Sequence, residues 1–299
     1  MYPIINILKS KVKKYLPDIV YFFIYRLLIK ARYHFSARTK EDAVRLEFSS
    51  FTSSLFKKVI VDGVSFEIKL DPNNGLVDKE IFSRGVWEPE MLKEIGAHIH
   101  PNSVCLDVGS NIGQHALYMA SIVLSGKVYA FEPIKKLTDQ IQESVSKNCI
   151  TNIEICQFGL SNENESKDIY LNNLNMGNTT FKKRIGASSV ARAETKIFDE
   201  FWGEKGKIDF LKLDVEGYEY YALLGMKKSL EKYHPTIIFE FSPVFYNKMN
   251  ISSKDILNYL FSLGYAMYDL EDSKKEITKE NSPKFIENTP TQTNILCLY

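Results

Sequence analysis

From residue 101 onward, short apolar runs alternate with segments whose apolar residues recur at helical spacing. Runs of β-branched and aromatic residues predict strands, and apolar positions three and four residues apart predict helices. In chain order these patterns predict strand 103–108, helix 114–125, strand 127–131, helix 137–148, strand 153–160, strand 208–213, helix 218–231 and strand 236–241. Strands that alternate with helices form a mostly parallel sheet covered on both faces. The pattern therefore predicts an α/β fold.

The C-terminal end follows a different pattern. A helix is predicted over 253–263, followed by strands over 265–270 and 294–299 that a polar segment joins. Strands without an intervening helix are most simply antiparallel, because parallel strands need a long crossover connection. We therefore predict a mostly parallel sheet with a C-terminal antiparallel strand.

A hairpin is predicted near the N-terminus, over residues 58–70. Its centre is Asp62-Gly63, a dipeptide that favours a tight turn because both positions tolerate a positive φ. Residues 72–75, Pro-Asn-Asn-Gly, then break the pattern. We expect an N-terminal extension over 1–74, composed of a basic helical arm and this hairpin, and a main domain over 75–299.

Composition limits the class of protein. Hydrophobic residues make up 44% of the 299 residues and charged residues 25%, which excludes global disorder. The formal net charge is only +1, which argues against a nucleic-acid partner. The charge is uneven, however, since residues 1–40 hold nine Lys or Arg and one Asp, a net +8, and the other 259 residues carry −7.

The basic arm contains an apolar run of 11 residues, 19–29, which is interrupted by Arg26. A membrane-spanning helix needs about 20 apolar residues, so this run is too short to span. It is typical of a helix docked on the protein itself or self-associating, or of an amphipathic helix lying on an anionic membrane surface. The four Cys residues have no metal-ligand spacing, as in a reduced cytosolic protein. We expect a cytoplasmic protein, with peripheral contact at the inner membrane surface left open.

Glycines and polar residues follow the first strand of the main domain. In open α/β sheets, ligands bind beyond the carboxyl ends of the strands. Here Asp107, Gly109, Asn111 and Gly113 occupy that position. A dinucleotide fingerprint would need Gly at 111 and Gly or Ala at 114, whereas the sequence has Asn111 and Gln114. A nicotinamide cofactor is therefore disfavoured.

Acidic residues follow three further strands. Glu132 ends the second strand, where a carboxylate can accept both hydroxyls of a ribose. Asp214 and Glu216 come directly after the strand at 208–213, and Glu240 lies at the end of the strand at 236–241. The acids should therefore gather at one edge of the sheet.

Four ordered motifs carry a family resemblance. They read LDVGSNIGQHALYMA (106–120), VYAFEP (128–133), IDFLKLDVEGYE (208–219) and IIFEFSP (237–243), with GVWEPEM (85–91) as a lead-in. Together they resemble the FkbM-type methyltransferases, a branch of the S-adenosylmethionine-dependent class I enzymes. The resemblance implies a Rossmann-like fold with S-adenosylmethionine as the methyl donor.

The resemblance also implies roles for the residues at the sheet edge. The glycine loop would shape the methionine end of the donor site, Glu132 would hold the ribose, Glu88 would reach the ammonium group, and the adenine would lie near 157–160. The implied donor-binding residues are Glu88, Asp107, Gly109, Asn111, Gly113 and Glu132.

An oxygen acceptor must lose its proton as it attacks the methyl group, so a base is needed nearby. The candidates are Asp214, Glu216, Glu240 and His115. Asp214 and Glu240 with one further oxygen ligand would also suit Mg²⁺. The spacing does not decide for or against a metal, and a divalent metal is not favoured.

The acceptor is less closely defined. The polar segment 172–202 is interpreted as a long loop over the site, with Asn178, Lys182 and Arg184 as acceptor contacts. We expect O-methylation of a sugar, a glycan or a related secondary metabolite, within glycan biosynthesis or a similar pathway. Two alternatives stay open: N-methylation of an amino sugar or amine, and a non-catalytic scaffold in a glycan-assembly complex.

Overall fold

The computed structural model describes residues 47–48, 53–171, 189–272, 275–289 and 291–299. The chain divides into two compact units, 1–52 and 53–299. The predicted basic arm and its apolar run lie outside the described residues. Among the described residues, no helix combines the length and the apolar character needed to cross a membrane.

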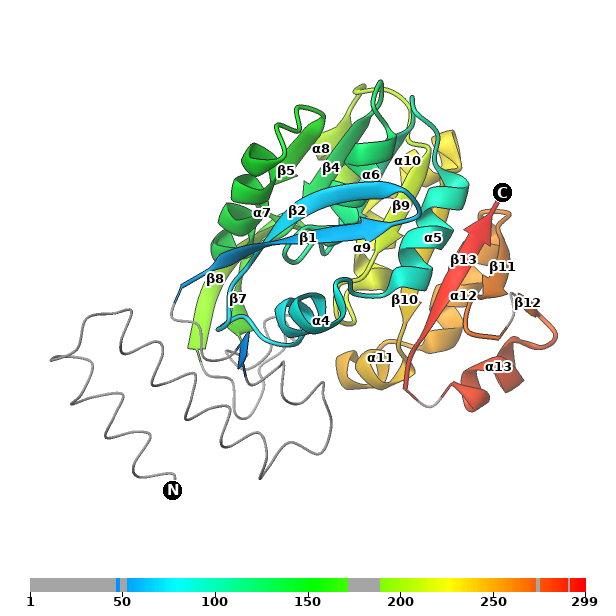
Figure 1. The fold of residues 1–299 in the computed structure, drawn as a ribbon. Helices are drawn as coiled ribbons and strands as arrows, with labels where there is room; N and C mark the ends of the chain where they lie inside the picture. Colours follow the sequence, from blue (N-terminus) through cyan, green and yellow to red (C-terminus); the bar gives the residue numbers. More distant parts are fainter. Residues whose placement is uncertain (1–46, 49–52, 172–188, 273–274, 290) are drawn as a thin grey trace, which may run out of the picture. The chain divides into compact units, whose positions relative to one another are not determined.

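The second unit is built around an eight-stranded sheet (Figure 1). The strand order is β12-β11-β13-β10-β9-β3-β4-β5, and β10, β9, β3, β4 and β5 run parallel. The strands are β3 (Val104–Val108), β4 (Lys127–Phe131), β5 (Ile153–Cys156), β9 (Phe210–Leu213), β10 (Thr236–Phe241), β11 (Ala266–Asp269), β12 (Lys275–Ile277) and β13 (Thr293–Leu298). Because β13 pairs antiparallel with both β10 and β11, the predicted fold class is confirmed.

Helices connect these strands and cover the sheet. They are α4 (Leu76–Arg84), α5 (Pro89–His98), α6 (Gln114–Ile122), α7 (Lys135–Lys147), α8 (Phe198–Trp202), α9 (Glu219–Gly225), α10 (Lys227–Tyr233), α11 (Pro243–Met249), α12 (Ser253–Ser262) and α13 (Ser282–Asn288). The helix predicted over 218–231 is divided in two, because the chain leaves helical geometry at Met226. Successive strand residues point to opposite faces. Leu211 and Leu213 of β9 therefore enter the large core with Leu223 of α9, and Lys212 points to the other face.

The predicted hairpin is confirmed as β1 (Leu55–Val61) and β2 (Val64–Leu70). Asp62 and Gly63 both have positive φ, 47° and 80°, as the tight turn requires. The hairpin lies against α6 and α7 (Figure 1). There the side chains of Ser144 and Asn148 accept backbone N–H groups of β2. It is thus part of the 53–299 unit, whereas the pattern alone grouped it with the arm.

A second sheet was not predicted. It has the order β6-β8-β7, formed by β6 (Gly159–Ser161), β7 (Glu165–Leu171) and β8 (Ser189–Ile197). The single strand predicted over 153–160 is therefore wrong, because the chain passes from one sheet to the other after Cys156. The loop predicted over 172–202 is also wrong for 189–202, which form β8 and α8. The acceptor contacts proposed at Asn178, Lys182 and Arg184 lie outside the described residues.

Candidate active site

A cavity of about 260 Å³ opens at the carboxyl ends of β3, β4, β9 and β10. The predicted site residues that line it are Glu88, Gly109, Asn111, His115, Glu132, Asp214, Glu216 and Glu240. Gly159 and Leu160 line it as well, in the region proposed for the adenine. Asp107 and Gly113 do not line the cavity. Asp107 is buried under the wall, and Gly113 immediately precedes α6.

The glycine loop is shaped by close backbone contacts. The N–H groups of Gly109 and Ser110 both donate to the carbonyl oxygen of Phe131, each at 3.0 Å, which joins the loop to the end of β4. Gly109 has φ 81°, and a Cβ placed on it would stand 1.8 Å from the carbonyl oxygen of Asp214. Only glycine allows this approach, so the loop and the end of β9 meet directly at the cavity.

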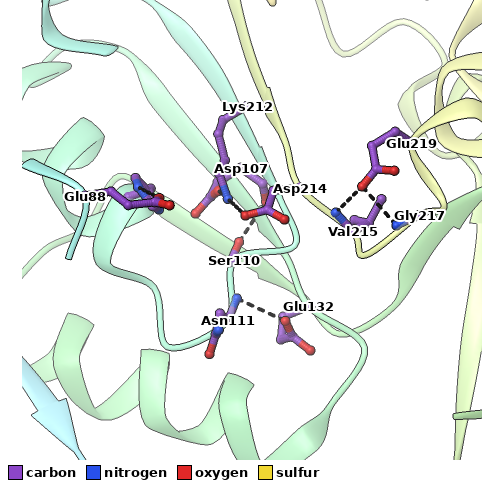
Figure 2. Close-up of polar contacts among 11 residues, drawn as sticks. Glu88, Asp107, Ser110, Asn111, Glu132, Lys212, Asp214, Val215, Gly217 and Glu219 are labelled. Carbon is purple, nitrogen blue, oxygen red and sulfur yellow. Dashed lines mark hydrogen bonds and ion pairs between the residues drawn. The ribbon is translucent and has the colours of Figure 1, made fainter. Parts of the chain in front are cut away.

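Glu132 joins the ends of β3 and β4. Its carboxylate accepts the N–H of Asn111 at 3.0 Å through Oε2 (Figure 2). It also accepts the N–H of Ile134 at 2.9 Å through Oε1. The side chain is buried, and this burial raises its pKa to about 7. Each oxygen keeps a second lone pair, so the carboxylate can still accept hydrogen bonds from ligand hydroxyls.

Lys212 is a site residue that sequence reasoning missed. It is the register partner of Asp107 on the neighbouring strand, and both residues are buried. Its Nζ lies 3.2 Å from Asp214 Oδ2 and 3.9 Å from Asp107 Oδ1 (Figure 2). Burial alone would lower the pKa of Lys212, but Asp214, Asp107 and Glu88 together raise it above its ordinary value. The ammonium group is therefore a fixed cation in the cavity wall.

Asp107 depends on this cation. Neither of its carboxylate oxygens has a hydrogen-bond partner among the described residues. Burial raises the pKa of Asp107, and the charge of Lys212 opposes that rise. The hydroxyl of Ser110 donates to the backbone carbonyl of Asp107 at 2.7 Å and so fixes the loop. The Ser110 side chain and the Ala116 N–H also act to lower the pKa of the Asp107 carboxyl. Asp107 thus supports the cavity wall.

Gln114 positions the segment that carries Glu88. Its Oε1 accepts the N–H of Trp87 at 2.8 Å, and its Nε2 donates to the Trp87 carbonyl at 2.7 Å. The next residue, Glu88, has the left-handed φ of 46°, which turns the chain into α5. Gln114, which departs from the dinucleotide fingerprint, therefore fixes the cavity-lining segment of Trp87 and Glu88 to α6.

Glu88 faces His115 across the cavity wall, with Glu88 Oε2 3.8 Å from His115 Nε2. This nitrogen has no hydrogen-bond partner among the described residues. Burial, and then the charge of Lys212, lowers the pKa of His115 well below its usual value. Burial and then the Asp214 charge raise the pKa of Glu88 to about 7. The imidazole is therefore neutral and can accept a proton only weakly.

A cluster of acids lies on the other side of Lys212. Burial, followed by the charges of Asp214, Glu219 and Glu216, raises the pKa of Glu240 to about 10. Glu219, which was not a predicted site residue, is fully buried in the first turn of α9. Its Oε1 accepts the N–H groups of Val215 at 2.8 Å and Gly217 at 3.3 Å (Figure 2). An excess of negative charge at this edge suits a cationic ligand.

Residues 107–267, more than half of the chain, match the family model of the methyltransferase FkbM domain. The match confirms the resemblance predicted from the motifs. It includes the glycine loop, Glu132, Lys212 and the acidic cluster, but not Glu88.

Several curated relatives are similar to this chain. The hexuronic acid methyltransferase AglP of Haloferax volcanii is 26% identical over 151 residues, which are 50% of this chain and 61% of AglP. Methyltransferase sdnD of Sordaria araneosa is 27% identical over 163 residues, 44% of this chain and 62% of sdnD. The AMB antimetabolite synthetase AmbE of Pseudomonas aeruginosa is 26% identical over 190 residues, 50% of this chain and 9% of AmbE. The chain thus spans less than two thirds of the length of each relative.

Solved structures with a similar fold have low sequence identity. The methyltransferase FkbM of Methylobacillus flagellatus aligns with a TM-score of 0.43 and 14% identity, over 67% of this chain and 44% of that one. The protein SMU.1697c of Streptococcus mutans, solved in complex with SAH, aligns with a TM-score of 0.41 and 13% identity, over 70% of this chain and 95% of that one.

Proposed function

Because the chain belongs to the FkbM methyltransferase family, we propose that it transfers the methyl group of S-adenosylmethionine to a hydroxyl of a sugar, glycan or related secondary metabolite. The observation that supports this most is the cavity itself, where Glu132 and the acidic cluster flank the glycine loop. A donor with ribose hydroxyls and a sulfonium charge offers the chemistry that these groups would bind.

In the proposed complex, Glu132 holds the ribose of the donor. It is already fixed by two backbone N–H groups, so little side-chain entropy is lost when it accepts the ribose hydroxyls. The loop from Gly109 to Gly113 brings backbone close to the donor, and Glu88 faces the ammonium group of its methionine portion. The sulfonium lies near Asp214, where negative charge is in excess.

The transfer is a direct displacement. The acceptor oxygen attacks the methyl carbon, the carbon–sulfur bond breaks, and its electron pair stays on sulfur to give S-adenosylhomocysteine. The hydroxyl proton passes to a carboxylate as the new carbon–oxygen bond forms. The sulfonium is already an activated electrophile, so the protein mainly aligns the two substrates and excludes water.

Asp214 is the proposed base. Its side chain is one third exposed at the cavity, and its Oδ2 accepts a hydrogen bond from Lys212 at 3.2 Å, which orients the carboxylate. Burial and the charges of Asp214, Glu219 and Glu216 raise the pKa of Glu240, so without a cation beside it this carboxyl favours its protonated form and can donate a hydrogen bond to the acceptor. The neutral His115 and the more peripheral Glu216 complete the wall around the methyl group.

The acceptor class is proposed from the relatives. AglP is described as a hexuronic acid methyltransferase, which favours a sugar hydroxyl. An amine acceptor would need a deprotonated nitrogen beside several carboxylates, which instead stabilise the ammonium form. The hydroxyl is therefore the preferred acceptor.

Calorimetric titration with S-adenosylmethionine and S-adenosylhomocysteine tests the donor site. We expect saturable binding by the full chain and a loss of about 10- to 100-fold in affinity for Glu132→Ala, the cost of about 1.5–3 kcal/mol for hydrogen bonds to a charged group. The matched control is Glu154→Ala on β5, whose carboxylate pairs with Lys127 at the surface. If the wild-type chain binds neither molecule, the proposed function is wrong.

A labelled-methyl assay tests the acceptor. The panel contains neutral sugars, uronic acids, amino sugars and lipid-linked sugars, and we expect label on a hydroxyl oxygen of a sugar. Label on nitrogen would replace O-methylation by N-methylation. Donor binding without transfer to any member would instead support the scaffold alternative.

A further inference from the structure

Glu219 is a buried acid that the proposed methyl transfer does not use. Its side chain is 0% exposed, and Oε1 is occupied by the N–H groups of Val215 and Gly217. The second oxygen, Oε2, is buried without a hydrogen bond of good geometry among the described residues. The Tyr246 hydroxyl, which donates to the Glu240 backbone carbonyl at 3.0 Å, also interacts with the Glu219 carboxylate. Because an unpartnered carboxylate oxygen is costly in the interior, Glu219 needs a cation or a proton beside it.

Two further carboxylates converge on Glu219. Asp214, Glu219 and Glu240 each offer one oxygen, and these three oxygens lie within 4.8 Å of one another. Glu240 Oε2 is also buried and without a hydrogen-bond partner among the described residues. Asp214 and Glu240 line the cavity, whereas Glu219 does not (Figure 2 shows Asp214 and Glu219). The three oxygens therefore surround a point at the cavity wall.

The nearby positive charge is too small for this cluster. Lys212 is the one Lys or Arg among the described residues that line the cavity, and it already faces Asp107 and Asp214. If Glu219 and Glu240 were ionised as well, Asp107, Asp214, Glu219 and Glu240 would place four carboxylates beside one ammonium group, in addition to Glu88, Glu132 and Glu216 of the cavity lining. A doubly charged cation would offset part of this negative charge.

We propose that Asp214, Glu219 and Glu240 bind one divalent cation of the oxygen-preferring kind, such as Mg²⁺ or Mn²⁺. Such cations take carboxylate oxygens at about 2.0–2.6 Å, so ligands on opposite sides of the ion stand about 4–5 Å apart, in keeping with the observed spread. Its remaining positions would face the cavity and accept water or a ligand hydroxyl.

This inference rests on the proposed function, because the cation would act on the acceptor hydroxyl of the proposed methyl transfer. A cation at the cavity wall would bind the acceptor oxygen and lower the pKa of its hydroxyl. Asp214 would offer the cation one oxygen and keep the other to accept the proton, and the attack on the methyl carbon would be favoured. Two other occupants could neutralise the cluster: protons, and the sulfonium of the donor.

The full chain is titrated with Mn²⁺, and binding is monitored by calorimetry and by electron paramagnetic resonance. These measurements distinguish a bound cation from protons or the donor sulfonium. Glu219→Gln keeps a carbonyl oxygen for the N–H groups of Val215 and Gly217 and replaces the second oxygen by an amide nitrogen that does not bind metal. Glu154→Gln on β5 is the matched control. We expect saturable binding by the wild type and the control, and at least about tenfold weaker binding by Glu219→Gln.

A thermal melt distinguishes a metal ligand from a merely structural residue. Without metal, Glu219→Gln should be at least as stable as the wild type, because it removes a buried carboxylate with an unpartnered oxygen. Mn²⁺ should raise the Tm of the wild type and leave that of Glu219→Gln unchanged. If Glu219→Gln does not fold, Glu240→Gln is measured in the same way.

Each outcome decides the inference. No saturable Mn²⁺ binding at millimolar concentration, with or without S-adenosylhomocysteine, overturns it, and so does equal binding by the wild type and the Gln variants. S-adenosylhomocysteine is titrated in the same experiments. Its binding without Mn²⁺ binding rejects the cation site alone, whereas its failure to bind rejects the proposed function.

Discussion

Replacing Gly109 by Ala perturbs the point where the glycine loop meets the end of β9. The added Cβ would stand 1.8 Å from the carbonyl oxygen of Asp214, whereas real Cβ contacts essentially never fall below 3.0 Å. The two segments would have to separate by about 1.2 Å, the difference between these distances. Because the obstacle is backbone, no side-chain rotation relieves the contact.

Two costs add at this position. The φ of 81° is left-handed, which costs an alanine about 1–2 kcal/mol. Forcing the packed segments apart costs about 1–3 kcal/mol more. Gly63→Ala is the matched control, because Gly63 has nearly the same φ, 80°, and no atom within 4 Å of its Cβ position. The control therefore measures the backbone cost alone.

Urea denaturation and donor calorimetry on both variants test this reasoning. Gly109→Ala should lose about 2–5 kcal/mol of unfolding free energy and Gly63→Ala about 1–2 kcal/mol. Donor affinity should fall only in Gly109→Ala. The substitution displaces the glycine loop, which lines the proposed donor site and is joined to β4 by the N–H groups of Gly109 and Ser110. Equal denaturation midpoints, or equal donor affinity in the two variants, would refute the steric argument.

Three further predictions concern buried charges. Lys212→Met should lower the free energy of unfolding at pH 7 by about 3 kcal/mol, because it leaves Asp107 buried without its cation, and denaturation should show a smaller loss at acidic pH. Burial raises the pKa of Asp78 to about 6 from an unfolded value of 3.8. Its contribution to the free energy of unfolding is therefore full below pH 3.8 and is lost as the pH rises through 6. Asp78→Asn should thus flatten the decline in stability between pH 4 and 7, a change of up to about 3 kcal/mol in denaturant titrations. For Glu132, with a pKa of about 7, donor affinity measured by calorimetry should rise between pH 6 and 8 as the carboxylate ionises, and Glu132→Gln should reduce that rise to the part contributed by Glu88, whose pKa is also raised to about 7.

The main sheet could be predicted because its signals are local. The strand at 127–131 is found with its predicted bounds, and the turn at Asp62-Gly63 has the predicted positive φ values. The second sheet depends instead on pairing between segments far apart in the chain. Even so, the sequence of β8 contains a strand signal. Buried Ala193 and Thr195 alternate with more exposed neighbours, which is the two-residue period of a strand, but the polar composition of the segment concealed it.

The candidate site was predictable wherever its residues follow a parallel strand, because strand ends share one edge of the sheet. Glu132, Asp214 and Glu240 were found in this way, and all three line the cavity. Lys212 lies inside a strand, where the pattern predicts an apolar residue. Its only signal was a charge within the apolar run FLKL, and its pairing with Asp107 depends on the register of β3 and β9.

Glu219 shows why the electrostatics of the site needed the structure. An acid in the first turn of a helix is ordinarily a solvated residue that interacts with the helix dipole. Here the Glu219 side chain is fully buried, and one of its oxygens accepts the N–H groups of Val215 and Gly217 in the preceding turn. Burial converts a common surface residue into a charge that raises the pKa of Glu240 and leaves an oxygen without a partner. In an exposed turn the same residue would be solvated, so the case for a cation depends on the enclosure of Glu219 together with the excess of acids over Lys212.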